Sequence, residues 1–171
     1  VKGMAEEGNT YVGFLYAGLM ITTKGEPKVI EYNCRFGDPE TQPIMMRLES
    51  DLVALCLAAL SGKLDQASAN WSEHPSIGIV LAAGGYPGDY KKGLLIEGLD
   101  KIDAEQCKVF HAGTTEKDGQ ITTSGGRVLC VTVRADSFEA VRAIAYDSVA
   151  KIQWPGVQFR QDIGFRAVGR L

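Results

Sequence analysis

Near its start the chain carries a strand–turn–strand pattern, and this pattern constrains the fold more than any other feature. Residues 11–21 are rich in aromatic and β-branched side chains, residues 24–27 read Lys-Gly-Glu-Pro, and residues 28–33 resume an extended pattern. The pattern predicts an antiparallel β-hairpin. Because an isolated hairpin is only marginally stable in water, its strands must belong to a larger sheet. No strand pattern precedes the hairpin and the chain opens on Val1 rather than Met, so we expect a fragment of a longer protein.

A helical pattern and then a polar stretch follow the hairpin. Apolar residues recur at helical spacing from Ile44 to Ala59, which predicts a long amphipathic helix that can break near Ser50-Asp51. Gly62 is a typical helix stop, and the residues after it are mainly polar as far as Pro75. We therefore assign residues 1–62 to a first domain, residues 63–74 to a linker and residues 75–171 to a second domain.

The second half combines several strands with one helix. Strands are expected over residues 77–83, 108–114 and 127–134, with a turn at Asp118-Gly119. Asp136 and Glu139 have the spacing of a helix capping box, and the apolar residues after them follow one face of a helix. This half is mainly β with a packed helix, so the chain as a whole is predicted to have the α+β fold class.

Composition excludes two classes of partner. The 171 residues include 18 Lys and Arg against 21 Asp and Glu, a net charge of -3, and they contain no basic block that could follow nucleic-acid phosphates. No apolar run approaches the roughly 20 residues that cross a bilayer, and the start of the chain lacks a signal-peptide pattern. We therefore expect a cytoplasmic protein with no nucleic-acid partner and no membrane partner.

Cysteine and glycine usage adds two expectations. The cysteines lack the paired spacing of a zinc site and no histidines accompany them. We expect reduced and mostly buried thiols at Cys34, Cys56, Cys107 and Cys130. Glycine accounts for 20 of the 171 residues, well above the usual level of roughly 7%. The excess indicates tight turns or close approaches of the backbone to a ligand.

The second strand of the predicted hairpin carries candidate metal and phosphate ligands. Residues two apart on a strand face the same side, so Glu31, Asn33 and Arg35 are expected to share one face. Carboxylate and amide oxygens suit Mg²⁺, which commonly binds one or two carboxylates together with water and nucleotide phosphates. Arg35 could hold a phosphoryl oxygen or a carboxylate. Spacing alone also permits a merely solvated polar face, and that alternative stays open here.

The segment after this strand has two readings. Asp38 precedes Pro39, a residue favoured at the first helical position, so Asp38 is a candidate helix N-cap and Glu40 a first-turn acid. Alternatively, the same turn presents backbone amides and side chains to a small polar substrate. Pro43 complicates the helical reading, because a proline beyond the first turn breaks a helix.

Other polar candidates lie in the second half. Gly84 and Gly85 follow a predicted strand in a stretch that matches no standard phosphate-binding motif, so a structural turn and ligand approach both remain open. His111 is expected to be a hydrogen-bonded structural residue and His74 to be exposed. No Ser, Cys or Lys lies in a recognisable nucleophile motif, so covalent enzyme catalysis is not expected.

Taken together, these motifs resemble a known family. Residues 31–42 read Glu-Tyr-Asn-Cys-Arg-Phe-Gly-Asp-Pro-Glu-Thr-Gln, which looks like the signature of the glycinamide ribonucleotide synthetases. These enzymes, also called phosphoribosylamine:glycine ligases, are ATP-grasp enzymes of purine synthesis. Residues 13–20, 83–90, 110–114 and 125–128 are similar to the same family in the same order. The resemblance covers essentially the whole chain, although members of the family are more than twice as long.

The resemblance implies an organisation and a set of site residues. Residues 1–62 would be the final part of an ATP-grasp domain, an antiparallel hairpin plus a long helix, and residues 75–171 the family's small, mainly β C-terminal domain. Glu31 and Asn33 would be the Mg²⁺ or Mn²⁺ ligands, and any further acidic ligand must come from the absent N-terminal part. Arg35 is the expected catalytic residue. The expected substrate contacts are Arg35, Asp38, Gly84 and Gly85.

The resemblance also implies a reaction. ATP phosphorylates the carboxylate of glycine, and the amino group of 5-phosphoribosylamine then attacks the acyl phosphate to give glycinamide ribonucleotide, ADP and phosphate. Such chemistry needs positioning and charge neutralisation more than a protein nucleophile. The expected partners are therefore glycine, 5-phosphoribosylamine, ATP and the N-terminal part of the same enzyme, without which this chain is expected to be inactive.

Two alternatives remain at this point. The chain could be a non-catalytic binding or assembly module that pairs with another strand through the exposed edge of its hairpin. It could also belong to a different ATP-dependent carboxylate ligase, with similar metal chemistry and another amine acceptor. A stable dimer that buries residues 11–21 would identify the first alternative, and identification of the product made by the intact enzyme would identify the second.

Overall fold

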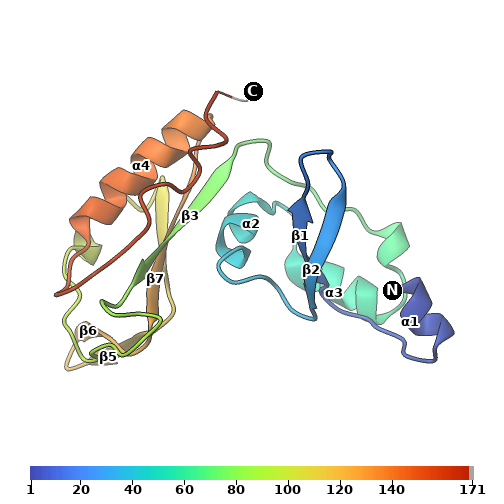
Figure 1. Cartoon of the computed structure of the whole chain (residues 1–171), viewed down its shortest axis with the longest axis horizontal. Helices are drawn as coiled ribbons and strands as arrows, with labels where there is room; N and C mark the ends of the chain where they lie inside the picture. The colour runs from blue at the N-terminus through green and yellow to red at the C-terminus, as the bar shows by residue number, and fades with distance from the viewer. Residues whose placement is uncertain (170–171) are drawn as a thin grey trace. The chain divides into compact units, whose positions relative to one another are not determined.

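The computed structural model describes residues 1–169 and divides into two compact units (Figure 1). Unit 1 consists of residues 1–41 and 48–71, and unit 2 consists of residues 42–47 and 72 onward.

The expected hairpin forms the sheet of unit 1. Strand β1 (Tyr16–Ile21) pairs antiparallel with β2 (Pro27–Asn33), and a register shift between Gly18 and Leu19 marks a β-bulge. A short helix, α1 (Lys2–Glu6), precedes the hairpin. The sheet has only these two strands within the described part of the chain. Its apolar side chains on both faces remain exposed, including Leu19, Val29 and Ile30.

The predicted long helix is broken at the expected place. Helix α2 (Thr41–Arg47) ends before Ser50, and α3 (Leu52–Leu60) begins after Asp51. The Asp51 carboxylate caps α3 by accepting hydrogen bonds from the backbone amides of Val53 and Ala54, at 2.7 and 3.2 Å. Gly62, in the left-handed conformation with φ 66°, follows the end of α3 as expected. A single 3-10 turn, η1 (Leu64–Gln66), lies in the stretch that we assigned to a linker.

The prediction that Asp38 caps a helix starting at Pro39 was wrong. Asp38 and Pro39 lie in a turn joined by a cis peptide bond, and α2 begins only at Thr41. The Thr41 amide and hydroxyl both donate to the carbonyl of Gly37, which fixes this later start. Pro43 therefore falls within the first helical turn, where its missing N–H removes no helical hydrogen bond, and it does not break the helix.

Unit 2 is built on a three-stranded antiparallel sheet covered by one helix. Strand β7 (Arg127–Arg134) lies between β3 (Ser76–Ala82) and β4 (Cys107–His111). Helix α4 (Phe138–Lys151) packs along this sheet (Figure 1). Six consecutive residues of β7 are buried, so both faces of this central strand are covered, the face under α4 and the opposite one. The α+β fold class predicted from the sequence is confirmed.

Two details of unit 2 differ from the sequence prediction, whereas the expected turn at Asp118-Gly119 is present. The strand expected over 108–114 is interrupted, since β4 ends at His111 and β5 (Thr114–Lys117) starts a separate hairpin with β6 (Gln120–Thr123). The interruption lies at Gly113, where any Cβ would clash with the backbone of Gly125. The turn at Asp118-Gly119 joins β5 to β6. The cap of α4 is Ser137 rather than Asp136, since the Ser137 hydroxyl accepts from the Ala140 amide at 3.1 Å.

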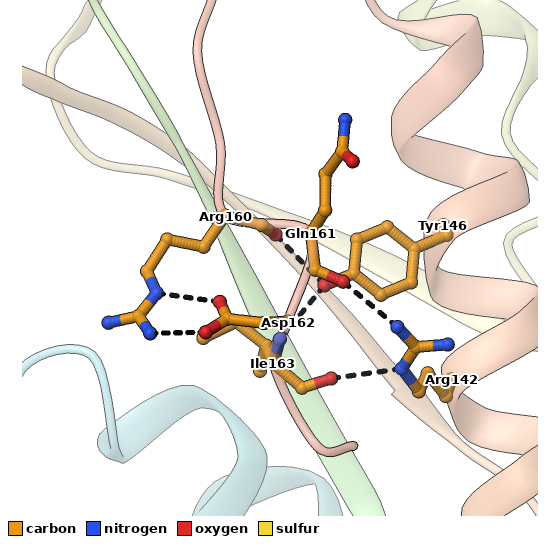
Figure 2. A network of polar contacts seen from close by, with 6 residues as sticks. All are labelled: Arg142, Tyr146, Arg160, Gln161, Asp162 and Ile163. Atoms are coloured by element: carbon orange, nitrogen blue, oxygen red, sulfur yellow. Dashed lines mark hydrogen bonds and ion pairs between the residues drawn. The ribbon is translucent and has the colours of Figure 1, made fainter.

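The last segment of unit 2 is tied back to α4 by a polar network (Figure 2). The Tyr146 hydroxyl donates to the carbonyl of Arg160 at 2.9 Å and accepts from the amide of Ile163 at 3.1 Å. The Arg142 guanidinium donates to the carbonyls of Gln161 and Ile163, at 2.9 and 3.2 Å. Two α4 side chains thereby satisfy four backbone groups of an otherwise irregular segment, which holds it in place without a strand or helix of its own.

The cysteine expectation was right on oxidation state and only half right on burial. All four cysteines are free thiols. Cys107 and Cys130 are buried, whereas Cys56 is half-buried and Cys34 is exposed on β2's outgoing end. Cys34 follows a strand whose faces are both open, so its position in an extended run did not lead to burial. Among residues 1–169, no helix is long and apolar enough to cross a membrane.

Candidate functional site

The hairpin brings Glu31 and Asn33 close to the same region of β1. In the register of the sheet, Glu31 lies opposite Gly18 and Asn33 lies opposite Tyr16. A Cβ placed on Gly18 would lie 3.1 Å from Cγ of Glu31. The Glu31 side chain therefore extends over Gly18, which has no side chain of its own. Within residues 1–169, the Glu31 carboxylate accepts no hydrogen bond and forms no ion pair, and both of its oxygens are open to a ligand.

Arg35 lies beside Asn33, but in the bend after β2, which ends at Asn33, and not on the strand face that was expected to carry it. Its guanidinium donates to Oδ1 of Asn33 at 3.4 Å and to the carbonyl of Phe36 at 2.7 Å. One terminal nitrogen of the guanidinium binds the Phe36 carbonyl, and the other binds Asn33 at the end of β2. Oδ1 of Asn33, the atom that would coordinate a metal ion, therefore accepts a hydrogen bond from the Arg35 guanidinium in this structure.

Sequence reasoning missed two residues of this cluster, Tyr16 and Glu40. The Tyr16 hydroxyl donates to Oε1 of Glu40 at 3.3 Å, which joins β1 to the turn before α2. The Glu40 carboxylate raises the pKa of the Tyr16 phenol, desolvation and the Glu31 charge add to the increase, and Arg35 opposes it. The position of Glu40 inside the 31–42 motif was a signal that could have drawn attention to it.

The turn that carries Asp38 packs closely against these residues. Gly37 is buried, and a Cβ there would approach the ring of Tyr16 to 3.0 Å and clash with the Glu40 carboxylate. The rings of Phe14 and Phe36 stack with centroids 3.9 Å apart. Asp38 itself is exposed on the turn. The close packing at Gly37 fixes the backbone on which the predicted substrate contact at Asp38 is carried.

The oxygen donors of this cluster fit a hard divalent cation but do not complete its coordination. Glu31 and Asn33 supply a carboxylate and an amide oxygen, the ligand types that Mg²⁺ prefers. Across the described part of the chain, no group of three or more His, Cys, Asp or Glu side chains is arranged to hold a metal ion. A cation bound by this pair would take its other ligands from water, phosphate oxygens or another part of the protein.

In unit 2, Gly84 and Gly85 form a tightly constrained turn. A Cβ on Gly84 would lie 2.5 Å from the carbonyl oxygen of Gly156, and Gly85 has φ 99°, which disfavours any other residue. Gln158 pairs with Ala82 just before the turn, and its side-chain amide donates to the carbonyl of Tyr86 at 2.9 Å. Glycine here has a structural reason, and the same turn forms one wall of a pocket of about 690 Å³.

The two histidines contact residues other than the candidate site residues. His111 is exposed, with Nδ1 3.1 Å from the Thr114 hydroxyl, which agrees with the expected hydrogen-bonded role. His74 is exposed, as expected, and its Nδ1 lies 3.2 Å from the Asp136 carboxylate. Neither histidine is placed near the Glu31 cluster by any hydrogen bond within residues 1–169.

Comparison with known families shows to which family the chain belongs. Residues 76–166 match the family described as phosphoribosylglycinamide synthetase, C domain, over more than half of the chain. Residues 1–41 match the family described as phosphoribosylglycinamide synthetase, ATP-grasp (A) domain. The chain belongs to the phosphoribosylglycinamide synthetase family. The resemblance inferred from the 31–42 motif is therefore confirmed.

Curated members of the family are similar along nearly the whole chain. The phosphoribosylamine–glycine ligase of Pseudomonas aeruginosa is 62% identical over 170 residues, which cover 99% of this chain and 40% of that protein. The ligase of Escherichia coli O157:H7 is 59% identical over 171 residues, with the same coverage of 99% and 40%. The chain thus spans about 40% of the length of the synthetases that it matches.

Solved structures agree with this assignment. A crystal structure of phosphoribosylamine–glycine ligase from Thermotoga maritima has a TM-score of 0.78 at 36% identity, over 94% of this chain and 39% of that one. The biotin carboxylase domain of Hydrogenobacter thermophilus 2-oxoglutarate carboxylase has a TM-score of 0.64 at 20% identity, over 92% of this chain and 35% of that one. The second likeness concerns the fold alone.

Proposed function

We propose that this synthetase chain is the C-terminal part of a phosphoribosylamine–glycine ligase of purine synthesis. In the proposed reaction, a carboxylate oxygen of glycine attacks the γ-phosphorus of ATP and the bond to ADP breaks. The amine of 5-phosphoribosylamine then attacks the glycyl carbonyl carbon, the bond to phosphate breaks, and the amine loses a proton. The support is the 62% identity to a curated ligase, together with a hairpin cluster whose side chains suit this chemistry.

The domains follow the sequence assignment in this proposal. Residues 1–62 complete an ATP-grasp domain whose other parts lie in the N-terminal portion of the enzyme, residues 63–74 link it onward, and residues 75–171 form the C-terminal domain. The proposed location is the cytoplasm. ATP is the co-substrate, and most of its binding surface belongs to the N-terminal portion.

Glu31 and Asn33 are proposed to hold Mg²⁺ or Mn²⁺. The free carboxylate of Glu31, the room that Gly18 leaves for it, and the amide oxygen of Asn33 two residues along the same strand support this role. The metal ion, when bound, would neutralise phosphate charge during transfer. Arg35 is proposed as the catalytic residue that binds the transferring phosphoryl group, because its guanidinium already lies beside the Asn33 oxygen at 3.4 Å.

Asp38, Gly84 and Gly85 are the proposed substrate contacts. Asp38 is exposed on a turn fixed by Gly37 and is suited to the ammonium group of glycine, while Arg35 suits the carboxylate. Gly84 brings backbone to the surface of the unit 2 pocket without a side chain in the way, and Gly85 follows it in the same turn.

One variant pair tests the hairpin cluster in a full-length ligase that carries this sequence. Glu31→Gln should lower kcat at least about 100-fold and raise the metal concentration needed for half-maximal rate, because one charged oxygen ligand is lost. The matched control is Glu26→Gln, an exposed acid of the same hairpin that pairs with Lys28 at 3.6 Å. The rates of product formation and ADP release give kcat and the metal dependence of both variants. A Glu31→Gln enzyme with unchanged metal dependence would contradict the assignment.

A second test concerns the 171-residue chain alone. It should show negligible ligase turnover, because most of the ATP-binding surface is assigned to the N-terminal portion. Robust turnover without another polypeptide would contradict the proposed placement of the ATP site.

The exposed hairpin supports one alternative function, an assembly module that pairs with another strand. The side chains of Leu19, Val29 and Ile30 are 47%, 54% and 64% exposed, which is unusual for β-branched and aliphatic residues of a sheet. A dimer that survives dilution and loses stability on Val29→Lys substitution would favour this function over the ligase.

A further inference from the structure

The pocket in unit 2 has the size and walls of a ligand site. Its volume of about 690 Å³ falls in the range of small-molecule sites, roughly 300–1,000 Å³. It lies entirely within unit 2, and its lining comes from two separate segments of the chain. The lining residues are Gly84, Asp89, Tyr90, Lys91, Leu94, Pro155 and Gly156.

The two segments that line the pocket are fixed to each other. Ala82 and Gln158 exchange backbone hydrogen bonds of 2.8 and 3.0 Å next to the pocket. The Ala83 amide donates to the carbonyl of Gly126 at 2.8 Å, and Gly84 lies against Gly156 too closely for a side chain. The network of Figure 2 anchors the chain that continues from Gln158 to α4. The pocket is therefore formed before any ligand arrives.

The polar groups of the pocket are not used by the fold. Within residues 1–169, neither the Asp89 carboxylate nor the Lys91 ammonium forms a hydrogen bond or an ion pair with another residue. Asp89 and Lys91 lie two positions apart in the chain, and both side chains are exposed. Between them, Tyr90 is half-buried and adds an aromatic surface beside the apolar Leu94. One unused anion, one unused cation and an apolar wall thus line a single cavity.

We propose that this pocket binds the sugar phosphate portion of a substrate, with Lys91 on the phosphate and Asp89 on the sugar hydroxyls. A carboxylate accepts hydrogen bonds from hydroxyl groups, and an ammonium attracts a phosphate. Tyr90 and Leu94 suit the C–H face of a sugar ring. The backbone of Gly84 allows close approach of the ligand. The inference rests on the proposed function, since 5-phosphoribosylamine is the phosphorylated sugar of that reaction.

The decisive experiment measures three KM values in a full-length ligase that carries this sequence. Lys91→Gln should raise KM for 5-phosphoribosylamine about tenfold, the loss expected for one charge-assisted contact, and leave KM for ATP and glycine unchanged. Asp89→Asn should raise the same KM by a smaller factor. The matched control is Lys117→Gln, which removes the same charge from an exposed side chain of unit 2 that does not line the pocket. An unchanged KM for 5-phosphoribosylamine in Lys91→Gln overturns the proposal.

A second measurement separates this inference from the proposed function. Should the full-length protein fail to make glycinamide ribonucleotide, the ligase proposal falls, and binding of ribose 5-phosphate to the 171-residue chain then decides the pocket. Saturable binding that weakens in Lys91→Gln but not in Lys117→Gln supports the sugar phosphate site. No saturable binding, or binding that inorganic phosphate reproduces and ribose does not affect, overturns it.

Discussion

The two units use apolar residues in opposite ways. In unit 2, apolar side chains are buried, and every buried apolar side chain of residues 1–169 lies between Ile77 and Trp154. In unit 1, the hairpin and α3 leave apolar side chains exposed, for example Val53 at 66% and Leu60 at 76%, although Leu52 and Leu55 of α3 are half-buried. Unit 1 therefore carries the proposed metal ligands on a scaffold without buried apolar side chains, while unit 2 has a core of its own.

This difference teaches where the stability of each unit originates. A domain is held by the surface that it removes from water, so unit 2 should fold by its own packing. The hairpin and α3 of unit 1 leave large apolar surfaces in water, which is unusual unless another part of the protein covers them. We propose that the remaining ATP-grasp segments of the full-length synthetase cover unit 1. The position of Glu31 and Asn33 would then depend on residues outside this chain.

The largest effect that separates the units is the loss of a leucine side chain. Leu81→Ala, at a residue with 0% exposure in unit 2, should lower the free energy of unfolding by about 2–5 kcal/mol through lost burial and a cavity. Leu57→Ala on α3, where the side chain is 59% exposed, should change it by less than about 0.5 kcal/mol. Equal effects of the two substitutions would break the comparison.

Urea titration followed by tryptophan fluorescence can assign the unfolding transition to a unit. Trp154 is 5% exposed in the core of unit 2, whereas Trp71 is 46% exposed in unit 1. A Trp71→Phe background therefore makes the fluorescence report on unit 2. The midpoint should fall in Leu81→Ala and stay unchanged in Leu57→Ala.

A matched pair of glycines sharpens the comparison at a smaller scale. Gly25 and Gly98 have φ of 80° and 83°, so alanine strains the backbone of both to a similar degree, about 1 kcal/mol. Gly25 in the hairpin turn has nothing within 4 Å of an added Cβ, but at Gly98 the Cβ would clash with the carbonyl oxygen of Lys151. Gly98→Ala should therefore cost well over 1 kcal/mol and Gly25→Ala close to it. Similar losses of stability in the two variants would show that the backbone near Gly98 can shift to accommodate an added methyl group.

Parts of this structure could be predicted from sequence because they depend on local pattern. The hairpin, the break at Asp51 and the buried strands of unit 2 follow from alternation, capping and turn residues that lie next to each other in the chain. The contact between Asn33 and Arg35 does not follow from strand alternation, because β2 ends at Asn33 and Arg35 lies in the bend after it. The roles assigned to these residues remain predictions.

Other parts depend on contacts between distant residues and could not be predicted in this way. The hydrogen bond from Tyr16 to Glu40 joins residues 24 positions apart, and only the folded turn brings them together. The start of α2 was misplaced because Pro39 and Pro43 both allow a first-turn position, and the choice depends on the bonds that Thr41 makes to Gly37. Exposure of Cys34 likewise depends on what covers the hairpin rather than on the strand pattern.

The smallest expected effect concerns the pH dependence of unit 2. Burial raises the pKa of the Cys107 thiol, while the Ser148 hydrogen bond and the Lys151 charge oppose the increase. The folded state then keeps a proton that the unfolded state loses above the ordinary thiol pKa of about 8.5, so stability is fully present below that pH and falls as pH rises through the folded pKa. Cys107→Ala should remove this decline at alkaline pH, whatever its cost at pH 7. The control is Cys34→Ala at an exposed thiol of unit 1, which should leave the decline in place. Urea midpoints of the three proteins between pH 7 and 10 would measure it, and a decline that persists unchanged in Cys107→Ala would assign the alkaline sensitivity to a group outside this core.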